Sequence, residues 1–470
     1  MVTSFENTGS INTKAIKIWP RIRKVILIQE VMCVIPTILL LFNGIVLVSA
    51  FWFFSTFFIF QVINLYKKEF WGFSALLIGV IPIIMVLRQF LFHNIVLVLC
   101  VIAALLPLLK ISNGRIRLLH EKKFNLLFIS CLIYWILSFI NSGYYSTNLG
   151  VLELFFASYC LYNLSNKRLW FITTLWCYSI STLAIAIAFL PYGDRLGAVY
   201  IGDYFLGNPA SIGLPLTLVF FLSIIDQGKW LDISMNKPLK NILLLSSFTL
   251  IVLSTSRISW LVTIVGISLF FITGSPKVKL KLIIIIIFLS SLFFLLLQTQ
   301  QGQFISNWFN KIILAESYNE FLFKVTTGRS SQWELFPDMI YDSPLIGYGP
   351  GNSRTIFHNY AVNDLRIMTH QINLQIHGFF LQISIEMGLI GLFIIIVFLL
   401  HIVKQSYLFW KKTNNFISLV AILSFITIGL SISGFNAIVG VYLGLGFMGF
   451  HPQDHKYKKS IKVPLIKSLM

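Results

Sequence analysis

Charged side chains are scarce in this chain. Of its 470 residues, 11% are Asp, Glu, Lys or Arg, whereas 57% are hydrophobic and the mean hydropathy is +0.83. A water-soluble globule needs more polar side chains than this to cover its surface, so that class of protein is excluded. We therefore expect lipid to cover much of the surface, as in a polytopic integral membrane protein.

Acidic residues are the scarcer of the two charge types. Asp and Glu number 17 against 36 Lys and Arg, which gives a formal net charge of +19. A nucleic-acid-binding domain gathers its basic residues on one solvated face, but here they lie between apolar runs. Nucleic acid is therefore not an expected partner, and the basic residues need another explanation.

Cysteines are few and lack the spacing of a metal site. All five lie inside apolar stretches, without CxxC or Cys/His ligand patterns: Cys33, Cys100, Cys131, Cys160 and Cys177. We interpret them as small buried hydrophobes and expect neither disulfides nor a metal.

Long apolar runs fill most of the chain. A helix that crosses about 30 Å of hydrocarbon needs about 20 residues, and this length predicts about fourteen membrane spans. The fold class we predict is all-α, with a large extracytoplasmic loop and both termini in the cytoplasm. The spans are expected near 25–43, 45–65, 72–88, 91–110, 123–141, 147–164, 168–190, 209–226, 239–256, 257–274, 279–298, 378–404, 415–431 and 433–450.

Basic residues alternate between the connections of these spans. Short cytoplasmic loops retain Lys and Arg, and a cytoplasmic N-terminus places most of them inside. Eight remain outside: Arg88, Arg195, Arg257, Lys311, Lys324, Arg329, Arg354 and Arg366. The predicted division is a cytoplasmic segment 1–24, eleven helices in 25–298, an outer loop 299–377, three helices in 378–450 and a basic cytoplasmic tail 451–470.

Two outer connections are long, 191–208 and 299–377. Loops of this length are usually functional or disordered, and the larger one is rich in aromatic residues, Gly and Pro. We expect it to be ordered, with an interfacial helix in Phe304–Phe323 and another helix at Ser330–Tyr341. Its GYGPGN segment (347–352) lacks the Gly-Lys-Ser/Thr of a phosphate loop, so we expect a turn there.

Three basic residues on the outer side are candidates for chemistry. Arg257 lies between two apolar spans in STSRISW, Arg329 lies in TTGRSSQW, and His377 opens the span near 378. Each also has a structural interpretation: a snorkelling anchor, a loop arginine paired with Asp338 or Asp342, and an interfacial cap, respectively.

A helical projection from His377 places Ser384, Gly388 and Gly391 on one face. Small residues on such a face let another helix approach closely. Glu386 lies on the opposite side, and we interpret it as a structural hydrogen-bonding group inside the membrane rather than a catalytic partner.

Together these elements resemble the bacterial O-antigen ligase and O-antigen polymerase superfamily. The resemblance rests on Ser256-Arg257, on the TGR…W…DSPLIGYGPGN block from Thr327 to Asn352, and on the His377 pattern that ends in Gly-x-x-Gly at Gly391. The many-helix layout with one large outer loop also matches, and it implies a GT-C-like fold. One position departs from the ligases, which usually have Asn, Ser or Gln where this chain has Gly378.

The resemblance implies a glycosyl transfer on the outer face of a bacterial inner (plasma) membrane, in O-antigen or surface polysaccharide synthesis. The implied donor is a glycan on undecaprenyl diphosphate, and the acceptor is a hydroxyl of a glycan, lipid A core or another molecule. Inversion at the anomeric carbon is implied, without metal or cofactor, and a chain-length regulator or other polysaccharide assembly protein is a further implied partner. The implied catalytic base, donor-binding residues and structural glycines are His377; Arg257, Arg329 and, more weakly, Arg195; and Gly328, Gly388 and Gly391.

Two alternatives stay open. Polymerase and ligase are not separated by the sequence, although Gly378 favours the polymerase. A transporter or flippase of lipid-linked glycans would also have many helices, but transporters usually show internal repeats and charges near the midplane. This sequence has no evident repeat, and most outer charges cluster beside one long loop. We therefore favour the enzyme.

Overall fold

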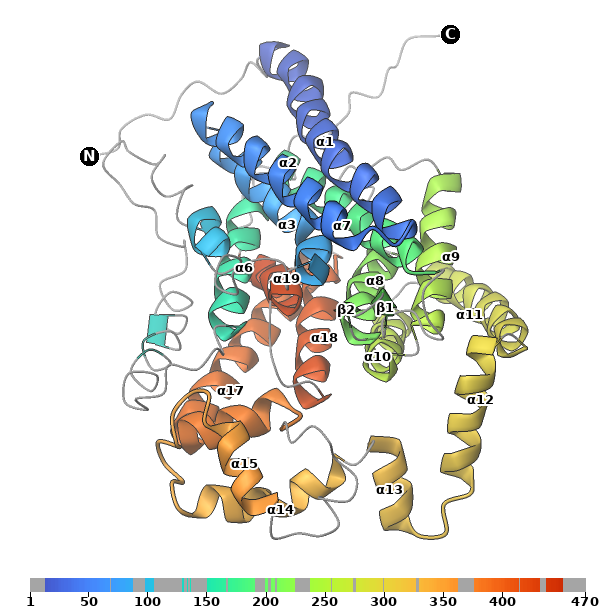
Figure 1. Ribbon diagram of the computed structural model, residues 1–470, viewed down its shortest axis with the longest axis vertical. Coiled ribbons are helices and arrows are strands. Elements are labelled where there is room, and N and C mark those ends of the chain that lie inside the picture. Colours follow the sequence, from blue (N-terminus) through green and yellow to red (C-terminus); the bar gives the residue numbers. More distant parts are fainter. Residues whose placement is uncertain are drawn as a thin grey trace.

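Helices dominate the described part of the chain in the computed structural model (Figure 1). The statements below concern the residues whose placement the structure describes. These are residues 13–67, 69–87, 98–104, 129–130, 133, 136, 150–165, 168–190, 199–201, 204–207, 209–224, 237–254, 256–273, 276–298, 300–326, 329–361, 376–413, 415–431 and 437–450.

Apolar helices form the body of the molecule, and each overlaps one predicted span. The other two predicted spans, 91–110 and 123–141, lie largely outside the described residues. The body helices are α1 (Thr13–Phe42), α2 (Val46–Tyr66), α3 (Phe70–Leu87), α6 (Gly150–Ser165), α7 (Arg168–Ala188), α8 (Pro209–Ile224), α9 (Lys237–Leu253), α10 (Arg257–Thr273), α11 (Pro276–Leu297), α17 (Phe379–Thr413), α18 (Ile417–Ser431), α19 (Ala437–Gly446) and the 3-10 helix η3 (Phe447–Phe450).

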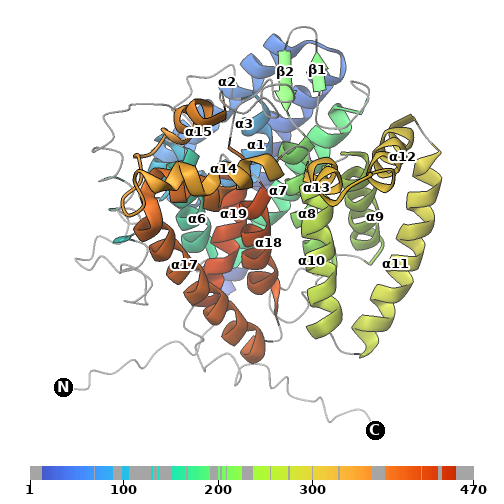
Figure 2. The same ribbon diagram turned by 90° about the horizontal axis from the view of Figure 1, so that it is seen from below.

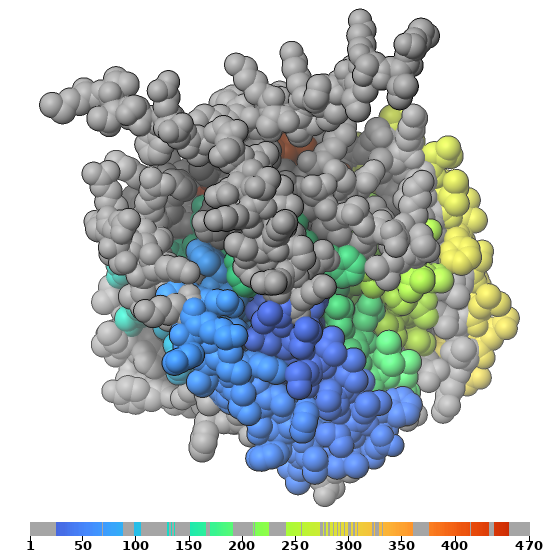
Figure 3. Space-filling view, turned by 90° about the horizontal axis from the view of Figure 1, so that it is seen from above, coloured from blue at the N-terminus to red at the C-terminus, as the bar shows by residue number. Residues whose placement is uncertain are grey.

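Five described stretches are long and apolar enough to cross a membrane by length and composition, and seven shorter apolar helices accompany them. Large apolar side chains such as Leu39, Phe51 and Val62 are exposed on α1 and α2, which lie side by side at one edge of the molecule (Figure 3). Such a surface suits lipid rather than water. The structure therefore supports a membrane-embedded helical protein, while the count of about fourteen and the GT-C-like fold stay predictions. The five long stretches are Val25–Phe42, Val46–Tyr66, Phe70–Leu87, Trp170–Ala188 and Phe379–Thr413.

Small residues allow the C-terminal helices to pack closely in the centre of this body. Gly440 and Gly444 lie four residues apart on α19, and a Cβ at either would come within 2.7–2.8 Å of a carbonyl oxygen of α6. Helices approach this closely only where the side chain is absent. The buried α19, which follows α17 and α18 in the chain, is thereby packed tightly against α6.

A second group of elements lies at one end of the helix body, the end where α11 finishes and α17 begins (Figure 2). It contains α12 (Gln300–Ile313), α13 (Tyr318–Thr326), α14 (Ser330–Tyr341), α15 (Ser353–Ala361) and the antiparallel strands β1 (Val199–Ile201) and β2 (Tyr204–Gly207). We call α12–α15 the outer layer. The predicted helix at Ser330–Tyr341 is confirmed. The all-α fold class holds for the described residues, with this short hairpin of β-branched and aromatic residues as a local addition.

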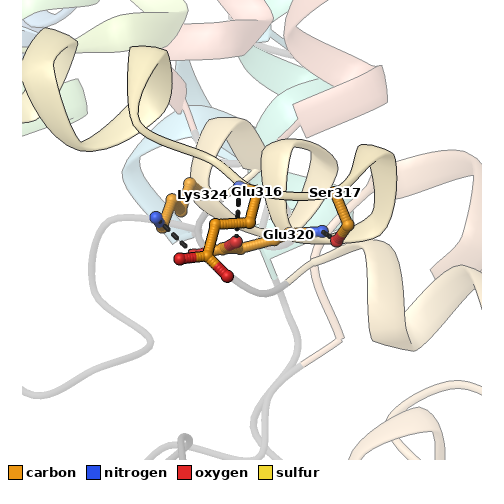
Figure 4. A network of polar contacts seen from close by, with 4 residues as sticks. All are labelled: Glu316, Ser317, Glu320 and Lys324. Carbon is orange, nitrogen blue, oxygen red and sulfur yellow. Dashed lines mark hydrogen bonds and ion pairs between the residues drawn. The ribbon is translucent and has the colours of Figure 1, made fainter.

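The expected single helix in Phe304–Phe323 is wrong, because α12 ends at Ile313 and α13 starts at Tyr318. Ser317 begins the new helix by accepting a hydrogen bond from the Glu320 backbone N–H at 3.1 Å, and the Glu320 carboxylate accepts one from the Glu316 N–H at 2.8 Å (Figure 4). Lys324 pairs with Glu320 one turn later. This Ser-x-x-Glu arrangement is a typical helix start, which explains the break.

Candidate functional site

Three chain segments meet at the end of the body that carries α12–α15: the start of α14, residues 376–378 before α17, and the end of α18. The Arg329 Nη1 donates to the Ser431 carbonyl oxygen at 2.8 Å, which joins α14 to the C-terminus of α18. The His377 backbone N–H donates to the Gln332 Oε1 at 2.8 Å, and Gln332 is fully buried. Arg329 and His377 were both predicted as site residues. They are 48 residues apart in sequence, and the structure makes them neighbours.

His377 lies just before α17 rather than on it. Gly378 has a φ of 113°, which a helix does not accommodate, and α17 starts at Phe379. A Cβ at Gly378 would also meet the Leu430 carbonyl oxygen at 3.4 Å. The helical projection from His377 is thus wrong at its first residue. The glycine that departs from the ligase pattern sets the direction in which the chain leaves His377.

Burial and a positive neighbour together make His377 a neutral base at pH 7. Burial is the larger cause that lowers the pKa of His377 to about 4, and the charge of Arg329 is the second. Burial also lowers the pKa of Arg329, but a guanidinium remains protonated at any pH relevant here. The site therefore pairs an uncharged imidazole with a permanent cation.

The expected structural partners of Arg329, Asp338 and Asp342, do not account for its position. Its guanidinium bonds to the carbonyl end of α18, where a cation is also favoured by the helix dipole. Asp342 instead accepts a hydrogen bond from the Tyr360 hydroxyl at 2.9 Å, and this bond is the largest cause that raises the pKa of Tyr360 to about 12.

Arg257 is the first residue of α10, and serines define where that helix begins. Ser259 donates to the Ser256 Oγ through its hydroxyl at 2.8 Å and its backbone N–H at 3.4 Å. Gly213 of α8 lies so close that a Cβ there would be 2.4 Å from the Ser259 Oγ. α10 packs against α18, and the start of α10 lies at the end of the body where α13 and α14 are found (Figure 2).

The helix that follows His377 is broken inside α17, at Gly388 (φ 65°, ψ −174°). A segment of the outer loop, Pro344–Gly349, lies against the break and pairs with the backbone groups that the helix leaves free. Four backbone hydrogen bonds join them: Leu389 N to Pro344 O (2.8 Å), Ile390 N to Leu345 O (3.2 Å), Tyr348 N to Ile385 O (2.9 Å) and Gly349 N to Glu386 O (2.8 Å).

Two glycines make this contact possible. A Cβ at Gly388 would lie 2.2 Å from the Leu345 carbonyl oxygen, and one at Gly347 would lie 2.5 Å from the Gly388 nitrogen. The expectation that Gly388 lets another helix approach is therefore wrong, because the closest neighbour is a loop. The turn expected at 347–352 is confirmed, since Gly347, Gly349 and Gly351 all have positive φ.

Sequence reasoning named some of these residues and missed others. Arg195 and Gly328 lie outside the described residues, and Gly391 is buried on α17. The roles of Gln332 and the Ser431 carbonyl were missed. Gln332 carries a weak signal, a polar residue one turn after Arg329, whereas a backbone carbonyl carries none.

Comparison with known proteins agrees with the resemblance. No curated protein matches the chain. Residues 242–396 match the model of the family described as O-antigen ligase. This segment runs from α9 into α17 and contains Arg257, Arg329 and His377 with all three sequence elements on which the resemblance rests. The match of residues 242–396 to the O-antigen ligase family therefore confirms the resemblance to the O-antigen ligase and polymerase superfamily.

Proposed function

We propose that this protein is a membrane glycosyltransferase that moves a glycan from an undecaprenyl-diphosphate donor to a sugar hydroxyl on the outer face of a bacterial inner membrane. The observation that carries the proposal is the neutral His377 beside the cationic Arg329, inside the segment that matches the O-antigen ligase family. A base next to a fixed positive charge suits a reaction in which a hydroxyl attacks a diphosphate-activated carbon.

The arginines would bind the diphosphate. A guanidinium fork donates two parallel hydrogen bonds to phosphate oxygens, which a lysine cannot match geometrically. We assign this role to Arg329 and Arg257, with Arg195 as a weaker candidate. The charge that develops on the departing diphosphate would be stabilised by the same groups.

His377 would accept the proton of the acceptor hydroxyl. The hydroxyl oxygen forms a bond to the anomeric carbon, the bond from that carbon to the diphosphate oxygen breaks, and the diphosphate leaves with the electron pair. A direct displacement of this kind inverts the anomeric configuration. Binding of the anionic diphosphate beside Arg329 offsets the positive charge that lowers the pKa of His377, so the donor itself would strengthen the base.

Both the polymerase and the ligase remain within this proposal. They differ in the acceptor, which is a second lipid-linked glycan for a polymerase and lipid A core or another molecule for a ligase. Exposed aromatic side chains in the outer layer, such as Trp333, would provide surfaces on which sugars stack. Gly378 continues to favour the polymerase.

The test is glycan transfer in reconstituted membranes from a lipid-diphosphate-linked donor. His377→Ala should lower the transfer rate by about 10²–10⁴-fold, as expected for loss of a general base. Arg329→Ala should lower it as well, and Arg329→Lys should restore only part of it because lysine lacks the fork.

Matched controls come from α15, where Arg354 and His358 are exposed. Arg354→Ala and His358→Ala should transfer glycan at the wild-type rate. If the wild type moves lipid-linked glycan across the bilayer without a new glycosidic bond, the protein is a flippase and the enzyme proposal is wrong.

A further inference from the structure

A buried carboxylate connects the outer layer to the broken helix. Glu386 is only 4% exposed and lies two residues before the break at Gly388. Its Oε1 accepts hydrogen bonds from the Ser353 hydroxyl at 2.6 Å and from the Gln382 side-chain nitrogen at 3.0 Å. The backbone amides of Gly351 and Ser353 also donate to this carboxylate.

Most of the hydrogen-bond partners of Glu386 lie at or just before the start of α15. Ser353 is the first residue of α15, so the carboxylate satisfies amides at the start of that helix, where an anion is favoured. The expectation that Glu386 is a hydrogen-bonding group is thus confirmed. Its partners, however, lie mainly in the loop of the outer layer rather than in another helix of the body.

The path from Glu386 to the candidate site is short. On α15, Phe357 is fully buried and packs with Met339 of α14, Ile376 and Ile385 in a small core of its own. Ile376 directly precedes His377, and α14 carries Arg329 and Gln332 at its start. Fixing α15 therefore fixes α14, and α14 contacts the backbone of His377 through Gln332.

We propose that Glu386 is a positioning residue that fastens the start of α15 to α17 and thereby holds Arg329 beside His377. The inference rests on the proposed function, because it concerns the two groups to which that function assigns the reaction. Glu386 does not touch the substrate in this proposal. It acts through the Gly351–Ser353 turn, α15 and α14.

Two measurements on purified full-length protein test the inference together. Glu386→Ala should lower the turnover number for glycan transfer by at least about tenfold, with a much smaller change in the donor KM, because displacements near 1 Å in a reacting pair cost about 10²-fold. Glu386→Gln, which keeps one acceptor oxygen, should recover part of the rate. Glu316→Gln changes an exposed carboxylate of the outer layer and should leave the rate unchanged.

Hydrogen exchange by mass spectrometry supplies the structural readout. In Glu386→Ala the amides of Tyr348, Gly349, Leu389 and Ile390 should exchange faster, while those of α1 and α2 keep the wild-type rate. If Glu386→Ala does not fold, Ser353→Ala removes one donor to the carboxylate and should show both effects at smaller size.

Four outcomes are informative. Faster exchange in 344–353 together with lower turnover supports the inference. Faster exchange with wild-type turnover, or unchanged exchange, overturns it. If the wild type itself transfers no glycan, the proposed function fails, whereas the exchange data still decide whether Glu386 fastens the loop.

Discussion

At the scale of single residues, the environment of His377 decides what the imidazole can do. A solvated histidine has a pKa near 6.5 and is partly protonated near neutral pH, whereas burial and Arg329 keep His377 neutral down to about pH 4. The backbone N–H of His377 donates to Gln332, so the main chain that carries the neutral imidazole is held in place. Free of its proton, it is available to accept one from a sugar hydroxyl.

This lowered pKa predicts how activity and stability depend on pH. The acid limb of kcat/KM, which reports the free enzyme, should lie near pH 4 rather than near 6.5. Between these values the unfolded chain binds a proton at His377 that the folded protein does not, so folding stability should decrease as pH falls from 6.5 to 4. His377→Gln should remove that part of the pH dependence from thermal unfolding curves. An acid limb at pH 6.5 would show that His377 is solvated.

At the scale of elements, α17 is longer than a membrane span requires, and the break at Gly388 divides it into two parts. A straight helix of the 35 residues in α17 would be about 52 Å long, whereas the hydrocarbon core is about 30 Å thick. The break at Gly388 separates a first part, packed with the outer layer, from a second part that continues through the body. The loop segment Pro344–Gly349 bonds to both sides of the break, so the bend is part of the architecture and not a defect.

Replacing Gly388 should therefore be costly. In Gly388→Ala the new Cβ would overlap the Leu345 carbonyl oxygen, and the backbone conformation is one that is essentially restricted to glycine. We expect a loss of about 1–3 kcal/mol or more in folding stability, measured as a lower unfolding temperature in detergent. Gly72→Ala is the control, because a Cβ there has only side-chain neighbours, the nearest being the end of Ile26 at 3.3 Å and the Trp170 ring at 3.4 Å. Equal unfolding temperatures for the two variants would contradict this assignment.

At the scale of the whole molecule, the arrangement is a body of apolar helices with an outer layer at one end. The start of α10, the outer layer and the start of α17 share that end (Figure 2). The alternation of basic residues predicts that this end faces away from the cytoplasm. The candidate residues would then meet a lipid-linked donor at the outer leaflet.

The predicted sidedness is open to a labelling test. A cysteine at Tyr341, which is 83% exposed in α14, should react with a membrane-impermeant maleimide in intact cells. A cysteine at Lys411, in the last turn of α17, should react only after permeabilisation. Four native cysteines are buried, and a Cys131→Ala background removes the fifth, which lies outside the described residues. The reverse labelling pattern would show that α14 faces the cytoplasm and that the predicted topology is wrong.

The sequence by itself determined the membrane class, the order of apolar helices, the helix at Ser330–Tyr341 and the three elements of the O-antigen ligase family. These follow from local composition, from helix length and from motif order, which are written along the chain. Only the tertiary structure decided that Arg329 bonds to the end of α18, that Gln332 holds His377, and that a loop rather than a helix fills the space at Gly388. Such contacts join residues distant in sequence through backbone carbonyls and amides. Because nearly every residue type carries these groups, no pattern of side chains in the sequence predicts the contacts.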